Sequence, residues 1–300
     1  MATVRVITTG SMEERALHRS LQAIFPEHTF VPHPRLDGFT SATLPPDYAD
    51  LAKRPRPPIN LDKFVGTIIG LFAPGRRQDR PRPDFVLAVE DLELVNAAAP
   101  ENVIGSVRSA FERKLESWPV DGPARRRLVE TVRERCSFHL MAPMTEAYFF
   151  ADAQALARAT HPGPDHPVQF DAATRDIEAF EVDDSNYLDA RHDPAIAWCT
   201  DNRARHPKHY LRYLTDPQLD GKHRYNELGP GVAALETLAW SEVVRTDTRP
   251  ATHARFARSL LADLHDMLGI AHDAQPAPPE PAHCHPLTWP PPASPVLRNL

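Results

Sequence analysis

The sequence is poor in cysteine and has no long apolar run, and each absence excludes a class of protein. Only three cysteines occur in 300 residues, at widely separated positions. Because an odd, dispersed set does not form a disulfide framework, we expect a reducing, cytoplasmic location. No stretch approaches the roughly 20 apolar residues that span a bilayer. The chain begins with a β-branched run rather than the pattern of a secretory leader, so we expect no membrane attachment.

Nucleotide-binding and nucleophile motifs are also missing. The chain has no GxxxxGK[ST] loop, no GxGxxG after an expected strand and no GxSxG turn. ATP hydrolysis by this chain alone is therefore not expected, and any ATPase would be a separate subunit. The net charge of −6 argues against bulk, nonspecific adhesion to DNA, but it leaves room for a local basic groove.

Proline, in contrast, is abundant, with 32 residues. Many lie in residues 44–58, which we interpret as an extended surface excursion, and in residues 276–295. Because proline cannot continue a helix or complete a strand ladder, the second stretch predicts an irregular tail, either mobile or laid over the surface. We divide the chain into an α/β domain over residues 1–158, a helical extension packed on it over residues 159–272, and a proline-rich tail over residues 273–300.

The first half of the chain alternates between strand and helix patterns. Apolar runs predict strands at residues 3–8, 84–91 and 137–142, and a further strand within residues 28–34. Helices are expected between them, beginning at Ser11, at Asn60 as N-cap, at residues 100 and 123, and at Pro143. This alternation predicts an α/β fold with a mostly parallel sheet flanked by helices.

The second half of the chain has few strand signals and is expected to be mainly helical. Helical spacing of apolar residues predicts helices at residues 207–214, 229–244 and 252–269. Tyr210 and Tyr213 in the first of these helices could stack on nucleic-acid bases, but their spacing favours packing in the core.

Acidic residues follow three of the expected strands. They are Glu13 and Glu14 after the first, Glu90, Asp91 and Glu93 after the second, and Glu146 after the third. The carboxyl ends of parallel strands share one edge of a sheet, where ligands bind in open α/β folds. Carboxylates that meet there repel one another unless a cation lies between them, and hard oxygen ligands suit Mg²⁺ or Mn²⁺. Such an ion positions a phosphodiester and activates water.

Each of these acids also has a structural interpretation. Ser11 and Glu14 fit a capping box, which leaves Glu13 as the freer ligand candidate. Asp91 fits a polar strand exit, and Glu146 fits the positive end of its helix. The three clusters together are more informative than any one of them.

Basic residues form two candidate phosphate-binding groups. One surrounds Lys208 in "RARHPKHYLRY", with Arg205 and Arg212, and the other is a loop that contains Arg76 and Arg77. An ammonium group near the acids would stabilise developing negative charge on a phosphate. A solvated surface and a contact with an acidic partner protein are the alternatives for both groups.

Three segments together resemble a TOPRIM-type domain. They are the strand, Gly10 and the acidic start of the helix that follows, the strand that ends in Asp91-Leu92-Glu93, and the strand that leads into "MTEAYFFADAQAL". The match is closest to the group related to OLD-family nucleases, which is often encoded beside AAA-type ATPases in bacterial anti-phage loci. "HPKHYLRYL" resembles a later Pro-Lys-x-x-Leu segment of that group, so the resemblance covers roughly residues 3 to 245.

The resemblance implies Mg²⁺-dependent cleavage of DNA or RNA in phage defence, with a separate ATPase partner. It also implies that Lys208 lies beside the metal and contacts phosphate. Thr9 stands where the family has a glutamate, so either Glu13 substitutes for it or the site is inactive. Two further functions therefore remain open: an adaptor or sensor subunit with a degenerate TOPRIM fold that assembles with a partner protein, and an unrelated cytoplasmic α/β hydrolase.

Overall fold

The computed structural model describes most of the chain. It covers residues 1–34, 36, 39–44, 58–74, 81–161, 163–164, 166–190, 203–216, 225–245, 247, 249–250, 252–270, 286–287 and 295–300. Arg76 and Arg77, which we expected to contact phosphate, lie outside the described residues. Most of the two proline-rich stretches also lies outside them.

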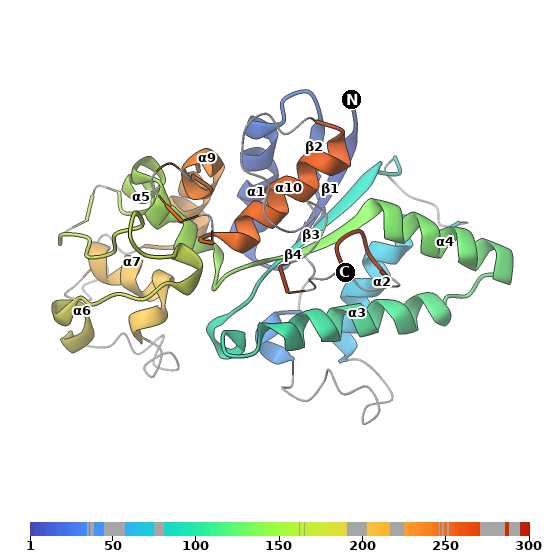
Figure 1. Cartoon of the computed structure of the whole chain (residues 1–300), viewed down its shortest axis with the longest axis horizontal. Helices are drawn as coiled ribbons and strands as arrows, with labels where there is room; N and C mark the ends of the chain where they lie inside the picture. The colour runs from blue at the N-terminus through green and yellow to red at the C-terminus, as the bar shows by residue number, and fades with distance from the viewer. Residues whose placement is uncertain are drawn as a thin grey trace.

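Four parallel strands form the sheet at the centre of the fold (Figure 1). They are β1 (Thr3–Thr8), β2 (Thr29–Pro32), β3 (Phe85–Asp91) and β4 (Cys136–Met141), in the order β2-β1-β3-β4. The α/β prediction is confirmed. The chain passes from β1 to β2 on one side and then crosses to β3 on the other. The connections after β1 and β3 therefore diverge, which opens a crevice at the carboxyl ends of these two strands.

Both faces of the sheet are covered by helices, because the strands bury side chains on both sides. In β3, Leu87 and Val89 belong to one core, while Val86 and Ala88 belong to the other. Helices α1 (Ser11–Ile24) and α10 (Arg255–Leu268) cover the Leu87 face. Helices α2 (Ile59–Gly70), α3 (Pro100–Glu116) and α4 (Gly122–Arg135) cover the Val86 face (Figure 1).

Short helical elements make up most of the rest of the chain, and the mainly helical second half is confirmed. They are η1 (Ser41–Thr43), η3 (Leu94–Asn96), η4 (Thr145–Ala151), α5 (Ala153–Ala159), η5 (Ile177–Ala179), α6 (Ser185–Asp189), α7 (Pro207–Thr215), η7 (Glu227–Gly231), α8 (Val232–Glu236) and α9 (Trp240–Val243). Among the helices that the structure describes, none has both the length and the apolar character needed to cross a membrane.

Aromatic side chains join the second half to the α1 face of the sheet. Tyr210 is fully buried and stacks on Phe150, with ring centroids 5.8 Å apart. Tyr210 and Tyr213 therefore pack in the core, as their spacing favours. The same core contains Leu17 of α1 and Leu264 of α10. It thus crosses the boundary that we place after residue 158, and the division into domains stays a prediction.

Local hydrogen bonding corrects several expected helix boundaries. Gly10, not Ser11, is the N-cap of α1, and no side-chain bond caps this helix, so the capping box is wrong. Helix α2 begins at Ile59 with Pro58 as N-cap, two residues earlier than the expected N-cap Asn60, because proline's fixed φ suits the residue before a first turn. The helix predicted from Pro143 is instead the 3₁₀ helix η4 followed by α5.

Asp152 explains the break between η4 and α5. Its backbone is extended, and its carboxylate accepts a hydrogen bond from Gln154 N at 2.9 Å, which begins a new helix instead of continuing the old one. The same carboxylate accepts from Ala239 N at 2.9 Å. The single helix predicted at residues 229–244 is therefore also wrong, since this stretch divides into η7, α8 and α9.

Residues 295–300 pack against the outer edge of β4. Arg298 N donates to Cys136 O at 2.8 Å. Asn299 accepts from Phe138 N at 3.0 Å and donates to Phe138 O at 2.7 Å. This described part of the tail is thus laid over the surface, where it supplies hydrogen-bond partners to a strand that has no neighbouring strand on that side among the described residues.

Candidate functional site

A pocket of about 350 Å³ lies at the carboxyl ends of β1 and β3, where the topology predicts a ligand site. We call it the acid pocket. Its lining consists of Gly10, Met12, Glu13, Asp91, Glu93, Met144, Glu146, His206, Lys208, Arg212 and Glu227. Six of the residues singled out in the sequence therefore meet in one place.

The alternation of side chains along β3 decides which acid reaches the pocket. Asp91 follows Leu87 and Val89 on the α1 face, and it lines the acid pocket. Glu90 belongs to the opposite face. Its carboxylate accepts hydrogen bonds from Thr9 Oγ1 and, at 2.8 Å, from Ser41 N. Glu90, which we expected among the metal ligands, does not line the pocket.

Glu13 reaches the pocket from the first turn of α1. A Cβ atom on Gly10 would overlap the Glu13 carboxylate, so only glycine leaves this carboxylate its present position. Glu13 is buried, whereas its neighbour Glu14 lines a different hollow. Glu13 is therefore the member of this acidic pair that lines the acid pocket, although the capping box from which we expected this is wrong.

Glu93 enters the pocket through a strained backbone. Its φ of 65° lies in the left-handed region, which side chains other than glycine rarely adopt. The Glu93 N–H donates to Pro143 O at 2.8 Å, which ties the residue to the segment that leads into η4. Strain of this kind concentrates at functional sites, where the surrounding structure enforces it.

Burial and mutual repulsion disfavour the charged forms of three pocket acids, Glu13, Asp91 and Glu93. Burial, followed by the charge of Glu146, raises the pKa of both Glu13 and Glu93 to about 7. Burial, and then the charge of Glu13, raises the pKa of Asp91 well above its usual value. The positive charge of Lys208 opposes the rise in the pKa of Glu13 and Glu93 but does not cancel it. A divalent cation would remove this repulsion.

Two neutral hydroxyl groups hold pocket acids, and no sequence pattern indicated either of them. Thr145 donates from both its N and its Oγ1 to Asp91 Oδ1, at 3.0 Å each. Tyr225 Oη donates to Glu146 Oε1 at 3.2 Å, across 79 residues of sequence. A contact between positions so far apart depends on the packed fold, and no spacing rule predicts it.

The cationic side of the pocket comes from α7. Lys208 forms an ion pair with Glu227 of η7, an acid that we did not predict. Arg212 also lines the pocket, one turn further along the helix. Arg205 does not, since its side chain is 59% exposed and lies 3.5 Å from the Glu181 carboxylate. A role for Arg205 in substrate binding therefore has no support from its position.

His206 is the N-cap of α7 and contributes a neutral group to the pocket wall. Its Nδ1 accepts a hydrogen bond from His209 N at 3.2 Å. Burial, together with the charges of His209 and Lys208, lowers the pKa of His206 to about 3. Because the imidazole stays neutral, it adds no positive charge to the balance between acids and cations.

The donor set fits a hard divalent cation. Five carboxylates and two cationic side chains line the acid pocket, and carboxylate oxygen is the preferred ligand of Mg²⁺ and Mn²⁺. Among the residues that the structure describes, no three acidic, histidine or cysteine side chains are already grouped around a common point. Binding an ion therefore requires at least one of the carboxylates to move toward the others.

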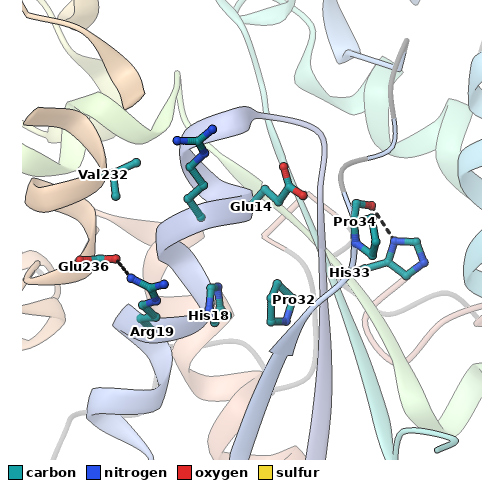
Figure 2. A pocket seen from close by; sticks show the side chains of 9 residues that line it. Glu14, His18, Arg19, Pro32, His33, Pro34, Val232 and Glu236 are labelled. Atoms are coloured by element: carbon teal, nitrogen blue, oxygen red, sulfur yellow. Dashed lines mark hydrogen bonds and ion pairs between the residues drawn. The ribbon is translucent and has the colours of Figure 1, made fainter. Parts of the chain in front are cut away.

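A larger hollow, of about 660 Å³, is lined by side chains of α1, of the end of β2 and of α8 (Figure 2). Charges of both signs line it, including Glu14 and Arg15, and Arg19 forms an ion pair with Glu236. Like charges do not converge there, so the smaller acid pocket is the better candidate for chemistry.

Comparison with known proteins gives no match from which a function could be inferred, so the geometry of the acid pocket is the main basis for one. No protein-family model, curated protein or solved structure matches the chain. The resemblance to TOPRIM-type domains therefore rests on the sequence motifs and on the acids that follow successive strands. Chemically, the pocket combines carboxylate oxygens, which are the ligands that hard divalent cations prefer, with a lysine and an arginine, which attract anionic groups.

Proposed function

We propose that the acid pocket binds Mg²⁺ or Mn²⁺ and that the protein is a nuclease-like subunit that hydrolyses phosphodiester bonds in DNA or RNA. The convergence of Glu13, Asp91, Glu93 and Glu146 in one pocket carries this proposal. These side chains come from three segments that are far apart in the sequence. The raised pKa values of Glu13, Asp91 and Glu93 mean that these three carboxylates are costly to keep together in their charged forms without a cation.

The four carboxylates would hold the ion, and the ion would supply Lewis-acid activation of a phosphate and of a water molecule. Lys208 and Arg212 lie on the same pocket wall and would bind the phosphate oxygens. As charge-assisted donors they would stabilise the negative charge that develops there. The buried positions of Glu13 and Glu146 would keep bulk water from screening these interactions.

The biological setting follows from the resemblance alone. We propose a role in anti-phage defence, in the cytoplasm, with a separate AAA-type ATPase subunit and a nucleic-acid substrate. An oligomer of this chain is compatible with such an assembly. Copurification with a neighbouring ATPase gene product, and loss of phage resistance when either is deleted, would support this setting.

Cleavage assays with acid substitutions test the activity. Purified protein with Mn²⁺ or Mg²⁺ is incubated with plasmid DNA, single-stranded DNA and RNA. Asp91→Asn and Glu13→Gln are expected to abolish cleavage. Glu90→Gln is the matched control, because Glu90 adjoins Asp91 but points to the other face of β3, and it should retain cleavage. Absence of cleavage by the wild-type protein on all three substrates would refute the proposal.

A non-catalytic adaptor is the second candidate, and two observations favour it. Thr9 occupies the position of the family's first acid and donates its hydroxyl to Glu90. Lys208 already has an acidic partner in Glu227. An adaptor would keep its partner protein in a pulldown when Glu13, Asp91 and Glu146 are all replaced by the amides, and it would keep its function in cells.

A further inference from the structure

Two of the pocket carboxylates are held by hydroxyl groups rather than by cations. Thr145 is completely buried and directs two hydrogen bonds to Oδ1 of Asp91. Tyr225 is almost completely buried and directs one to Oε1 of Glu146. Among the described residues, the other oxygen of each carboxylate makes no hydrogen bond.

A neutral donor and a cationic donor have different consequences for a carboxylate. A lysine or arginine would orient the group and also neutralise it, which would weaken its attraction for a metal ion. A hydroxyl orients the group and leaves its negative charge available. Outer partners of this kind commonly tune metal sites, and their loss typically reduces affinity by about 10- to 100-fold.

The fold holds both hydroxyls firmly in place. Tyr225 N donates to Thr215 Oγ1 at 2.9 Å, which anchors its backbone to α7. Around its side chain, a Cβ on Gly231 would lie 2.7 Å from Tyr225 Oη and 2.8 Å from Met12 Sδ, so the missing side chain of this glycine makes room for the hydroxyl. Thr145 is held by its own backbone N–H, which donates to the same Asp91 oxygen as its side chain.

We propose that Thr145 and Tyr225 are positioning residues that orient Asp91 and Glu146, without neutralising them, to receive a divalent cation. This inference rests on the proposed function, since it concerns the same ion. It extends the site beyond the ligands themselves and assigns roles to two residues that no sequence motif identified.

Calorimetric titration of the full chain with Mn²⁺ tests this inference independently of nuclease activity. Thr145→Val and Tyr225→Phe remove only the hydroxyls, and each should weaken Mn²⁺ binding by about 10- to 100-fold. Thr145→Ser restores a hydroxyl at the same position and should restore most of the affinity. Thr9→Val is the matched control, because its hydroxyl serves Glu90 outside the pocket, and it should leave Mn²⁺ affinity unchanged.

The possible results separate this inference from the proposed function. If the wild-type protein binds Mn²⁺ and both hydroxyl-deletion variants bind it equally well, the positioning roles are refuted while the metal site stands. If the wild-type protein binds no Mn²⁺, the proposed function fails and this inference fails with it. Thermal melts identify variants that fail to fold, and Tyr225→Phe still decides the question if Thr145→Val is one of them.

Discussion

Lys208 forms an ion pair with Glu227, and both side chains line the acid pocket. The pair joins α7 to η7, and both partners are partly exposed, so its contribution to stability is expected to be below about 1 kcal/mol. The lysine therefore lies at a position where its contribution to folding is small. Its place beside the acids supports the proposal that it faces a bound anion.

Replacement of Lys208 by methionine should reduce phosphodiester cleavage by about 100- to 1,000-fold, because it removes a cationic donor to the reacting phosphate. The free energy of unfolding should change by less than about 1 kcal/mol. Steady-state cleavage rates and urea unfolding check the two parts. The matched control is Lys114→Met, which breaks the similarly exposed ion pair of Lys114 with Asp62 outside the acid pocket and should leave cleavage unchanged.

Stability should fall as pH rises, in the absence of divalent metal. Burial raises the pKa of Glu90 from 4.5 to about 8 in the folded protein. The folded state therefore binds more protons than the unfolded state between about pH 4.5 and pH 8. Linkage then requires the contribution of Glu90 to the free energy of unfolding to be greatest below pH 4.5. This contribution declines as the pH rises through 8, by an amount on the order of a few kcal/mol.

Glu90→Gln isolates this contribution, because the amide cannot ionise. Urea unfolding in the presence of a chelator, at pH 5, 6, 7 and 8, should give similar stabilities for wild type and variant at pH 5. At pH 8 the variant should be the more stable of the two. A variant that loses stability in parallel with the wild type over the whole range would show that Glu90 is not the titrating group.

The sheet and the general location of the acids could be predicted from the sequence. Apolar runs identified the strands, and parallel topology brings their carboxyl ends to one edge, so the meeting of Glu13, Asp91 and Glu146 required no knowledge of packing. That Glu90 lies outside the acid pocket could not be predicted, because this depends on which face of the sheet each residue of β3 occupies. Its neighbour Asp91 lies on the face of β3 that packs against α1, and only the packed core of the folded protein shows which face that is.

Other features depended on contacts between distant segments. Tyr225 and Glu227 reach the pocket because the second half of the chain folds over α1, and no local pattern encodes that docking. The predicted N-cap of α1, Ser11, was wrong because Gly10 takes that position, where its lack of a side chain leaves room for the Glu13 carboxylate. This requirement comes from the pocket and not from helix formation. The positive φ of Glu93 is likewise imposed by its surroundings, since glutamate has no preference for it.

Gly10→Ala should impair metal binding more than it impairs folding. The new Cβ would occupy the position of the Glu13 carboxylate, and this flexible side chain would swing away at a modest cost. Mn²⁺ affinity, measured by titration calorimetry, should fall to that of Glu13→Gln, and the double variant should be no worse than either single variant.

Gly122→Ala is the control for Gly10→Ala. Its Cβ would meet only Arg126 Nη1 at 3.9 Å, at the start of α4. This variant should keep Mn²⁺ affinity and gain up to about 1 kcal/mol of stability, because alanine restricts the unfolded chain. Equal losses of Mn²⁺ affinity in the two variants would contradict the specific role of Gly10.

Asn299→Ala should destabilise the protein by about 2–4 kcal/mol, because it leaves the buried N–H and C=O of Phe138 without the partners they have now. Hydrogen exchange followed by NMR should show loss of protection at the Phe138 amide, while the amides of β1 at the centre of the sheet keep theirs. Unchanged protection at Phe138 would mean that this segment does not hold the β4 edge in solution.

The attachment of residues 295–300 to β4 has a consequence for biosynthesis. Asn299 emerges from the ribosome 161 residues after Phe138, an interval on the order of ten seconds at ordinary elongation rates. Throughout that interval the outer backbone of β4 lacks this partner and is open to pairing with strands of other nascent chains. Cotranslational chaperone demand, and the tendency of truncated products to aggregate, should therefore be highest before residues 295–300 are made.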